Sequence, residues 1–279
     1  TRQNDRKRIC DLMHTKMVYL KTDEEIELIK ISAQVLGKAH AEVAKLINPG
    51  VTTKELDRVA EEFIRDHKGH PSFKGYNGFP AALCISVNDV VVHGFPSAYR
   101  LKEGDIISVD CGVLLNGYHS DSAFTYPIGE IKPEIKQLLK RTYESLYAGI
   151  DKAVAGNRIG DVGYAVQSYV EQFGYGVVRE LVGHGVGKFL HEGPEVPNYG
   201  RRGQGPQLKE GMTIAIEPMI TLGKRSVVQE KDGWTIRTTD RQPAAHFEHT
   251  VAIRKGKAEI LTTFEYIEQV LAERSMAIA

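Results

Sequence analysis

The 279-residue sequence has few cysteines, no excess of charge of one sign and no long apolar run. Its three cysteines, Cys10, Cys84 and Cys111, are too few for a disulfide framework and favour a reducing compartment. Lysine plus arginine and aspartate plus glutamate each total 36, so no basic excess is available to drive nucleic-acid binding. The sequence contains no run of about 18 apolar residues, which excludes a membrane-spanning helix. Hydrophobic residues at 42% and charged residues at 26% indicate a globular rather than a disordered chain.

The beginning of the chain is polar and basic. Arg2, Arg6, Lys7 and Arg8 have no apolar segment behind them, so this stretch is not expected to be a secretory signal. We interpret residues 1–21 as a solvated tail, with a partner-binding arm as the alternative.

Two capping boxes predict where the ordered part begins. In each box, the threonine and the glutamate can accept a hydrogen bond from each other's backbone amide; the pairs are Thr22 with Glu25 and Thr52 with Glu55. Apolar residues follow both pairs at helical spacing. The helices are expected to end near residues 49 and 69, and further helices are expected at about 134–153 and 160–173. Strands are expected at 83–87, 90–92, 106–115, 176–182, 213–216, 234–237 and 247–253.

The order helix-helix-strands occurs twice, which indicates an internal duplication. Residues 101–110 (LKEGDIISVD) and 208–217 (LKEGMTIAIE) are identical at five of ten positions, and both end in a carboxylate. Gly50 and Gly156 repeat at nearly the same offset. We therefore predict an α+β fold of two pseudo-symmetric halves around a shared antiparallel sheet. The halves are expected at about 22–127 and 134–262.

Two aspartates are predicted to approach each other across a hairpin. The Asn116-Gly117 pair indicates a type I′ turn, because both positions of that turn need positive φ. Asp121 then pairs with Gly112, and Asp110 lies two residues away on the same face, with open space expected at Gly112. The two carboxylates would raise each other's pKa unless a divalent cation bound between them. This predicts a metal site, and two surface aspartates on a solvated sheet are the alternative.

The second half supplies residues that could complete such a site. Glu217 stands at the repeat position of Asp110, and Glu248 lies in a predicted strand although glutamate disfavours strands. His93, His184 and His191 have glycine-rich surroundings, which leave an imidazole accessible. Whether His249 is a structural or a functional residue is left open, because it adjoins Glu248. The remaining histidines are interpreted as structural: His14, His40, His67, His70, His119 and His246.

Other catalytic signatures do not fit this sequence. Residues 191–195 (HEGPE) are not a helical zinc motif, because the Gly-Pro pair would break the helix. No serine stands in a nucleophile elbow, and no Cys-x-x-Cys pair offers thiolate ligands. The carboxylate and histidine constellation is therefore the candidate for chemistry.

In their order and contexts, Asp110, Asp121, His184, Glu217 and Glu248 resemble the metal ligands of the type I methionine aminopeptidases, dinuclear metallopeptidases with the pita-bread fold. The resemblance covers roughly residues 22–262 and includes VHG at 92–94, GHGVG at 183–187, IEPM at 216–219 and FEHT at 247–250. It implies an α+β pita-bread fold, whose pseudosymmetry agrees with the repeat, in a single catalytic domain over residues 22–279.

The resemblance also implies the metal centre. Asp110 would chelate one ion, His184 and Glu217 would bind the second, and Asp121 and Glu248 would bridge both. Such mixed oxygen and nitrogen ligation suits Mn, Fe(II), Co or Zn. A water held between two divalent ions would attack the scissile carbonyl.

Three residues would act on the substrate in this interpretation. Glu217 would move a proton from the attacking water to the leaving amine. His191 would face the scissile carbonyl, and His93 would face the amide nitrogen.

The resemblance further implies an apolar pocket for the methionine side chain, lined by Phe73, Tyr76, Phe79, Cys84, Leu190 and Trp234. In the commonest bacterial pattern, a small residue stands at position 73, a hydroxylated aromatic at 79 and phenylalanine at 190. Phe73 is therefore expected to narrow the mouth of the pocket. Ordinary core packing is the alternative for all six residues, and it is the stronger alternative for Phe73 and Leu190.

The implied activity is removal of the initiator methionine from nascent proteins and peptides whose second residue is small. The implied protein is cytoplasmic and monomeric, with a weak contact to the ribosome but none to membranes or to specific nucleic acids. One alternative is a prolidase or proline aminopeptidase, which usually has a long N-terminal domain, whereas residues 1–21 precede the first predicted helix here. The other is a metal-free binding protein of the same fold, which would be expected to lack ligands.

Overall fold

The computed structural model describes residues 17–274, so Cys10, His14 and the basic residues of the predicted tail lie outside the described residues. The helices in that range are α2 (Asp23–Leu46), α3 (Thr53–Asp66), α4 (Pro133–Ile150), α5 (Ile159–Glu171) and α6 (Glu265–Glu273), with a 3₁₀ turn, η1 (Tyr76–Gly78). The strands are β1 (His70–Pro71), β2 (Leu83–Val87), β3 (Val90–Val92), β4 (Ile106–Leu115), β5 (Tyr118–Pro127), β6 (Gly176–Val177), β7 (Gly183–Gly185), β8 (Glu192–Val196), β9 (Thr213–Ile216), β10 (Met219–Thr221), β11 (Val227–Gln229), β12 (Ile236–Thr238), β13 (Ala244–His246), β14 (His249–Ala252) and β15 (Glu259–Ile260).

Both predicted capping boxes are present. The Thr22 hydroxyl accepts a hydrogen bond from the Glu25 amide at 3.3 Å, and the Glu25 carboxylate accepts one from the Thr22 amide at 2.9 Å. Thr52 and Glu55 make the same reciprocal pair at the start of α3. The predicted helices are confirmed, whereas α6 was not predicted. No helix within residues 17–274 is long and apolar enough to cross a membrane.

The β4–β5 hairpin has the predicted register. Asn116 and Gly117 both have positive φ, 52° and 82°, and Gly112 lies opposite Asp121. Strand β4 also pairs with β1 and β2, so this half of the molecule has a four-stranded sheet. The long hairpin thus fixes the two aspartates on neighbouring strands of one sheet.

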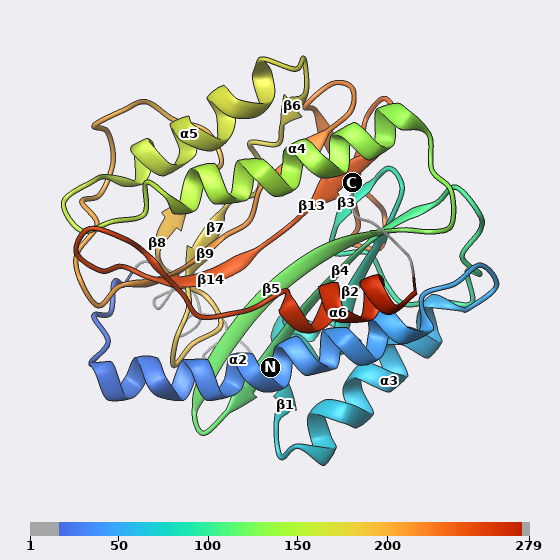
Figure 1. Cartoon of the computed structure of the whole chain (residues 1–279), viewed down its shortest axis with the longest axis horizontal. Helices are drawn as coiled ribbons and strands as arrows, with labels where there is room; N and C mark the ends of the chain where they lie inside the picture. The colour runs from blue at the N-terminus through green and yellow to red at the C-terminus, as the bar shows by residue number, and fades with distance from the viewer. Residues whose placement is uncertain (1–16, 275–279) are drawn as a thin grey trace.

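All pairings between described strands are antiparallel, but the strands form four sheets rather than one. The largest has the order β15-β14-β9-β7-β8, and two three-stranded sheets have the orders β13-β10-β6 and β11-β12-β3. The two largest sheets meet along β5 and β14, which lie side by side in Figure 1. At this junction the Glu248 amide donates to the Ala123 carbonyl at 2.9 Å, and the Thr250 hydroxyl donates to the Asp121 carbonyl at 2.8 Å.

Several short strands differ from the prediction. The strand expected at 247–253 begins at His249, and β13 ends at His246, so Phe247 and Glu248 lie between two strands. The strand expected at 176–182 is only Gly176–Val177, and the one expected at 234–237 is Ile236–Thr238. Seven strands of two to five residues were not predicted, because they show no alternation of apolar and polar residues: β1, β7, β8, β10, β11, β13 and β15.

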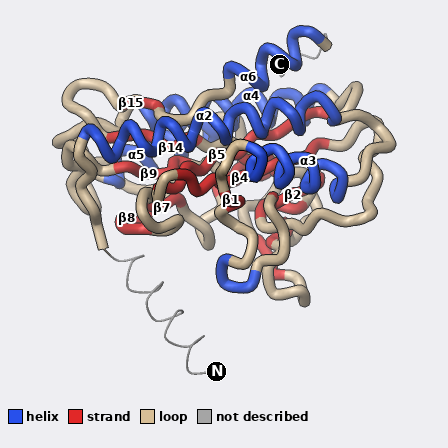
Figure 2. Tube along the Cα trace, turned by 90° about the horizontal axis from the view of Figure 1, so that it is seen from below, coloured by secondary structure: helices blue, strands red, loops and turns tan. Residues whose placement is uncertain are grey.

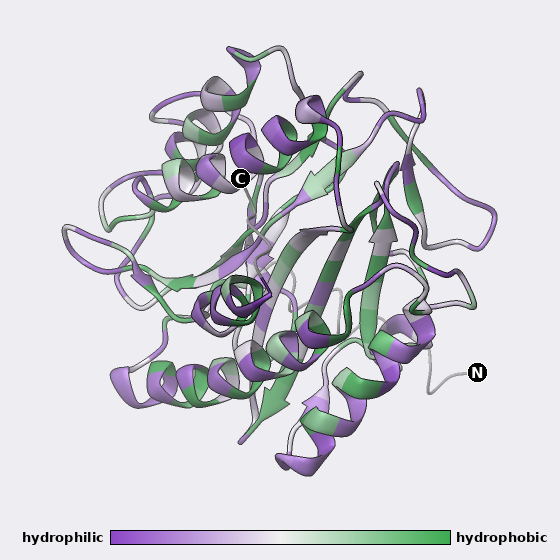
Figure 3. Ribbon diagram, turned by 45° about the vertical axis from the view of Figure 1, so that its right-hand side comes forward, coloured by the Kyte–Doolittle hydropathy of each residue, from purple (hydrophilic) through white to green (hydrophobic). Residues whose placement is uncertain are grey.

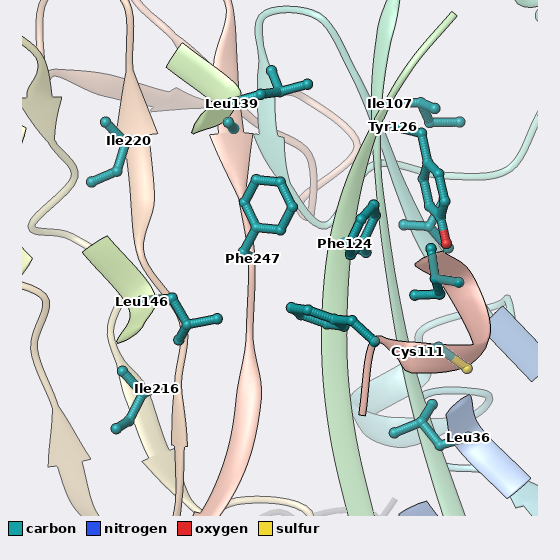
Figure 4. Close-up of a cluster of buried hydrophobic side chains, with 14 of the residues drawn as sticks. Leu36, Ile107, Cys111, Phe124, Tyr126, Leu139, Leu146, Ile216, Ile220 and Phe247 are labelled. Carbon is teal, nitrogen blue, oxygen red and sulfur yellow. The ribbon is translucent and has the colours of Figure 1, made fainter. Parts of the chain in front are cut away.

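The helices lie on one side of the strand layer (Figure 2). Polar residues mark their outer surfaces, and apolar residues predominate along the strands (Figure 3). The main core fills the space between the two layers (Figure 4), where the rings of Phe124 and Phe247 meet edge to face with centroids 5.1 Å apart. Because Phe247 points into this core, its neighbours His246 and Glu248 are free to face the other side of the strands.

The two segments of the internal repeat occupy equivalent backbone positions. The Gly50 amide donates to the Leu101 carbonyl at 2.7 Å, and the Gly156 amide donates to the Leu208 carbonyl at 3.0 Å. Both glycines have positive φ, 93° and 100°. These matching contacts agree with a duplication, and the boundaries of the two halves remain a prediction.

Candidate active site

A cavity of about 360 Å³ lies where the two largest sheets meet. All thirteen residues predicted for the site line it: Phe73, Tyr76, Phe79, Cys84, His93, Asp110, Asp121, His184, Leu190, His191, Glu217, Trp234 and Glu248. The fold thus brings residues from both halves of the chain to one place. The cavity has a polar floor of carboxylates and imidazoles beside an apolar wall.

The alternation of side chains along β4 presents Asp110 to this cavity. Val109 and Cys111 are buried in the main core, so Asp110 between them faces the other side. Asp121 on β5 faces the same way and is 3% exposed. The two predicted neighbours therefore lie together in a buried site and not on a solvated surface, which excludes the alternative interpretation.

We had expected open space between the aspartates at Gly112, but that space is filled. A Cβ atom at this position would lie 2.8 Å from the Ser72 Cβ and 3.0 Å from the Phe73 ring. The segment after β1 occupies that space, and the Ser72 amide donates to the Gly112 carbonyl at 2.9 Å. Glycine is needed here because Phe73, which lines the cavity, packs against the bare backbone.

His184 is oriented to offer one nitrogen to the carboxylates. Its Nδ1–H donates to the Gly185 carbonyl at 2.9 Å, which leaves the lone pair on Nε2. That Nε2 lies 3.8 Å from Asp121 Oδ2 and 3.7 Å from Glu217 Oε1. A backbone carbonyl on one ring nitrogen is the usual arrangement behind a metal-binding histidine.

Three carboxylate oxygens in the cavity have no hydrogen-bond partner within residues 17–274: Asp110 Oδ1, Asp121 Oδ1 and Glu248 Oε1. Burial raises the pKa of Asp110 and of Glu217 to about 7. Burial, followed by repulsion between neighbouring carboxylates, raises the pKa of Asp121 and of Glu248 well above the usual range. A bound divalent cation would relieve both the burial and the repulsion.

The ligand atoms form two overlapping groups that could hold metal ions. Asp121, His184 and Glu248 form the first, Glu217, His246 and Glu248 form the second, and within each group these atoms lie within 4.8 Å of one another. Since oxygen and imidazole donors of this kind suit divalent transition metals, the residues present fit a metal centre.

His246 was interpreted as a structural histidine, but it lies beside the candidate ligands. Its Nε2 lies 3.5 Å from Glu217 Oε2, and its side chain is 1% exposed. Strand β13, which ends at His246, was not predicted, and the two-residue spacing that places His246 and Glu248 on the same side was not used. This spacing was the signal that could have found it.

His191 lies beside His184, with ring centroids 4.2 Å apart. Its Nδ1 is 2.8 Å from the Tyr76 hydroxyl. Burial, followed by the neighbouring His184, lowers the pKa of His191 well below its usual value, so the ring is neutral near pH 7. A neutral ring that accepts the Tyr76 hydroxyl proton at Nδ1 carries its own proton on Nε2.

His93 has an unusual backbone conformation for a residue other than glycine, with φ of 58°. The next residue has to be glycine, because a Cβ on Gly94 would lie 2.2 Å from the Ile85 carbonyl oxygen. Burial lowers the pKa of His93 to about 4, so this ring is also neutral near pH 7. Positive φ at such a residue is a strained feature of the kind that clusters at functional sites.

The apolar wall forms a cluster separate from the main core. Phe73, Phe79, Ala81, Cys84 and Leu190 are buried in it, and Tyr76, Phe95 and Trp234 pack against them. Phe79 stacks on Phe95 at 5.2 Å and meets Trp234 edge to face at 5.2 Å. Phe95 was not predicted, although it follows the VHG segment directly. Phe73 and Leu190 therefore line the cavity and also pack within this cluster.

Comparison with known proteins gives consistent matches. Residues 27–255 match the profile of metallopeptidase family M24. The methionine aminopeptidase of Clostridium acetobutylicum is 53% identical over 250 residues, which cover 89% of this chain and 100% of that protein. The crystal structure of a methionine aminopeptidase from Thermotoga maritima has a TM-score of 0.87 at 45% identity, covering 88% of this chain and 100% of that one.

A more distant match shows the fold alone. The Xaa-Pro dipeptidase of Bacillus anthracis has a TM-score of 0.71 at 23% identity, covering 88% of this chain and 62% of that one. Together with the antiparallel sheets and the helix layer, these likenesses confirm the predicted pita-bread fold.

Proposed function

The chain belongs to the methionine aminopeptidases of metallopeptidase family M24, and from that premise we propose that its cavity hydrolyses the peptide bond after an N-terminal methionine. One observation carries the assignment to this cavity. Buried carboxylate oxygens without hydrogen-bond partners among residues 17–274 converge there with the Nε2 of His184. Such a cluster is unfavourable by itself and becomes favourable with bound cations.

Asp110, Asp121, His184, Glu217 and Glu248 would hold two divalent ions. Asp110 would serve one of them, His184 and Glu217 would serve the other, and Asp121 and Glu248 would contribute to both. Mn, Fe(II), Co or Zn bound there would supply Lewis-acid polarisation of the scissile carbonyl and lower the pKa of a water.

The protein's own groups then move protons and bind charge. Glu217 accepts a proton from the attacking water and delivers it to the leaving amine. His191 donates its Nε2–H to the oxyanion that develops on the carbonyl, with Tyr76 holding the opposite nitrogen. His93 contacts the amide nitrogen of the scissile bond.

The apolar wall binds the methionine side chain. Phe73, Tyr76, Phe79, Cys84, Leu190 and Trp234 provide an apolar surface with few polar atoms, which suits a thioether. The aromatic ring of Phe73 narrows the entrance to this surface. Because Tyr76 and His93 crowd the position of the second residue, peptides with a small second residue are the preferred substrates.

The natural substrates in this proposal are nascent chains and peptides with an N-terminal methionine. The enzyme acts in the cytoplasm as a monomer, with a weak contact to the ribosome. The low cysteine content and balanced charge support a reducing compartment without nucleic-acid binding.

The test is release of free methionine from Met-Ala-x, Met-Lys-x and Met-Arg-x peptides by metal-stripped protein to which each metal is added in turn. We expect no release without metal, restored release with at least one of the four metals, and a much larger kcat/KM for Met-Ala-x. Equal kcat/KM for Met-Ala-x and Met-Arg-x would contradict the proposed selectivity. Full activity of the stripped protein would contradict the metal centre.

A further inference from the structure

His246 is held rigidly at the edge of the candidate metal centre. It ends strand β13, where it pairs with Met219 of β10. Its backbone is anchored to β5, because the Thr125 hydroxyl donates to the His246 carbonyl at 2.7 Å and accepts from the His246 amide at 3.0 Å. The main chain is therefore held on two sides, and the ring is buried.

The Nε2 atom of His246 has no hydrogen-bond partner among the described residues. Its distance of 3.5 Å to Glu217 Oε2 exceeds the 2.7–3.2 Å of a normal N–H···O hydrogen bond. When two donor atoms bind one transition metal at about 2.1 Å each, with a tetrahedral angle between the two bonds, they lie about 3.4 Å apart. The observed spacing thus resembles that of two atoms that share an ion.

His246 and His184 stand on either side of the Glu217 carboxylate. His184 Nε2 lies 3.7 Å from Oε1, and His246 Nε2 lies 3.5 Å from Oε2. Each imidazole also belongs to a group of close ligand atoms that includes Glu248. The geometry around His246 is therefore as suitable for ligation as the geometry around His184.

We propose that His246 is a sixth protein ligand of the metal centre and binds, through Nε2, an ion that Glu217 and Glu248 also bind. This inference rests on the proposed function, because it adds a ligand to the centre assigned there. A second imidazole makes the donor set richer in nitrogen. Nitrogen donors favour Zn, Co and Fe(II), whereas oxygen donors suit Mn, so His246 should bias the choice of metal.

Loss of affinity alone would not prove ligation. A group that only hydrogen-bonds to a ligand commonly changes metal affinity by about 10–100-fold as well. A direct bond is distinguished by scalar coupling between the metal nucleus and the imidazole. In the experiment, the protein is prepared with isotope-labelled histidines and loaded with the NMR-active isotope of cadmium. NMR spectra then give the number of imidazoles that are coupled to the metal nucleus. His246→Gln is the variant, and His119→Gln is the matched control, since His119 is also a β-strand histidine but belongs to neither group of close ligand atoms.

We expect two coupled imidazoles in the unaltered protein and in His119→Gln, and one in His246→Gln. Calorimetric titration should also show that His246→Gln loses affinity for Zn and Co by a larger factor than for Mn. One coupled imidazole that persists in His246→Gln and disappears in His184→Ala would overturn the inference and leave the proposed function intact. No coupling and no binding of any divalent ion by the unaltered protein would contradict the proposed metal centre itself. The count in the unaltered protein decides the matter even if His246→Gln does not fold.

Discussion

At the scale of single residues, His184 and His191 are in ring contact but face different partners. His184 points Nε2 at carboxylates, whereas His191 is bonded at Nδ1 to the Tyr76 hydroxyl. We therefore predict that His191→Ala keeps both ions and lowers kcat by roughly 10²–10³-fold, about 3–4 kcal/mol, because only the developing oxyanion loses a donor. KM should change much less. His184→Ala should lose affinity for one ion, as measured by elemental analysis. Depleted metal in His191→Ala with full metal in His184→Ala would reverse the two assignments.

The hydrogen bond between Tyr76 and His191 allows a separate test of how His191 is positioned. Tyr76→Phe removes the 2.8 Å contact but keeps the aromatic ring against the pocket. The imidazole then loses the group that selects its tautomer and orientation. We expect kcat to fall about 10-fold, which corresponds to one hydrogen bond of about 1–1.5 kcal/mol, with KM nearly unchanged. Phe79→Leu serves as a comparison, because it alters the pocket without touching His191, and its effect should appear mainly in KM. A loss confined to KM in Tyr76→Phe would show that the hydroxyl acts in binding only.

The sequence predicted the site residues unevenly. Asp110 and Asp121 followed from a turn signal and the two-residue period of strands, which are local rules, and the hairpin has that register. The repeat and the local contexts made Glu217, Glu248 and three histidines candidates, but their roles and the pocket residues depended on resemblance, because their contacts join segments far apart in the chain. His246 was missed because β13, whose last residue it is, was not predicted, so the face that it shares with Glu248 was not recognised. Local propensity cannot predict such a strand when it is three residues long.

At the scale of elements, an ion pair ties the first described residues to the loop that carries His191. Lys21 and Glu192 form a salt bridge whose side chains are 3% and 1% exposed. Backbone bonds add to it, since the Gly193 amide donates to the Met17 carbonyl at 2.8 Å and the Lys21 amide donates to Gly211 at 2.7 Å. Residues 17–21, the described part of the predicted tail, are therefore tied to β8 and to Gly211, with the Lys21 side chain buried and those of Met17, Val18 and Leu20 exposed.

We predict that Lys21→Met destabilises the protein by about 3–5 kcal/mol, because it leaves Glu192 buried without its cation. Lys188→Met is the matched control. Lys188 pairs with Glu25 at 3.1 Å but is 61% exposed, so its loss should change stability far less than the loss of Lys21. The free energy of unfolding in urea measures both. The double variant Lys21→Met with Glu192→Leu should recover part of the loss, and equal effects of the two lysine variants would refute a stabilising role for the buried pair.

The helices were predictable and many of the strands were not, for one physical reason. Helices α2 and α3 are specified by caps and apolar spacing within their own sequence. Strands such as β7 and β10, each of three residues, exist because neighbouring strands supply their hydrogen bonds. The repeat helped because it links distant segments, and the equivalent bonds of Gly50 and Gly156 appear where the repeated segments begin.

At the scale of the whole molecule, burial of the carboxylates couples metal binding to pH. Asp110 and Glu217 have raised pKa values of about 7, so the folded protein without metal holds protons there that the unfolded chain releases near pH 4. Between those values the folded state binds more protons than the unfolded state, so this contribution to stability falls as pH rises. The buried histidines act in the opposite sense, because burial lowers the pKa of His40 and His93 to about 4. Stability of the metal-free protein alone therefore does not isolate the site.

The difference in the free energy of unfolding between metal-loaded and metal-free protein does isolate the site, since groups away from the site contribute equally to both. Metal must displace the protons on Asp110 and Glu217, so apparent affinity should rise as pH increases through about 7. Between about pH 6 and pH 8, one such proton changes the dissociation constant roughly 10-fold and two change it roughly 100-fold. At fixed metal concentration well above the dissociation constant, this adds about 1.4–2.7 kcal/mol to the stabilisation by metal at the higher pH.

Calorimetric titration and paired thermal melts with Mn or Zn measure the dissociation constant and the stabilisation by metal. Glu217→Gln should flatten the pH dependence by removing one titrating carboxyl, and affinity that is constant or falls with rising pH would show that these carboxyls do not bind the metal.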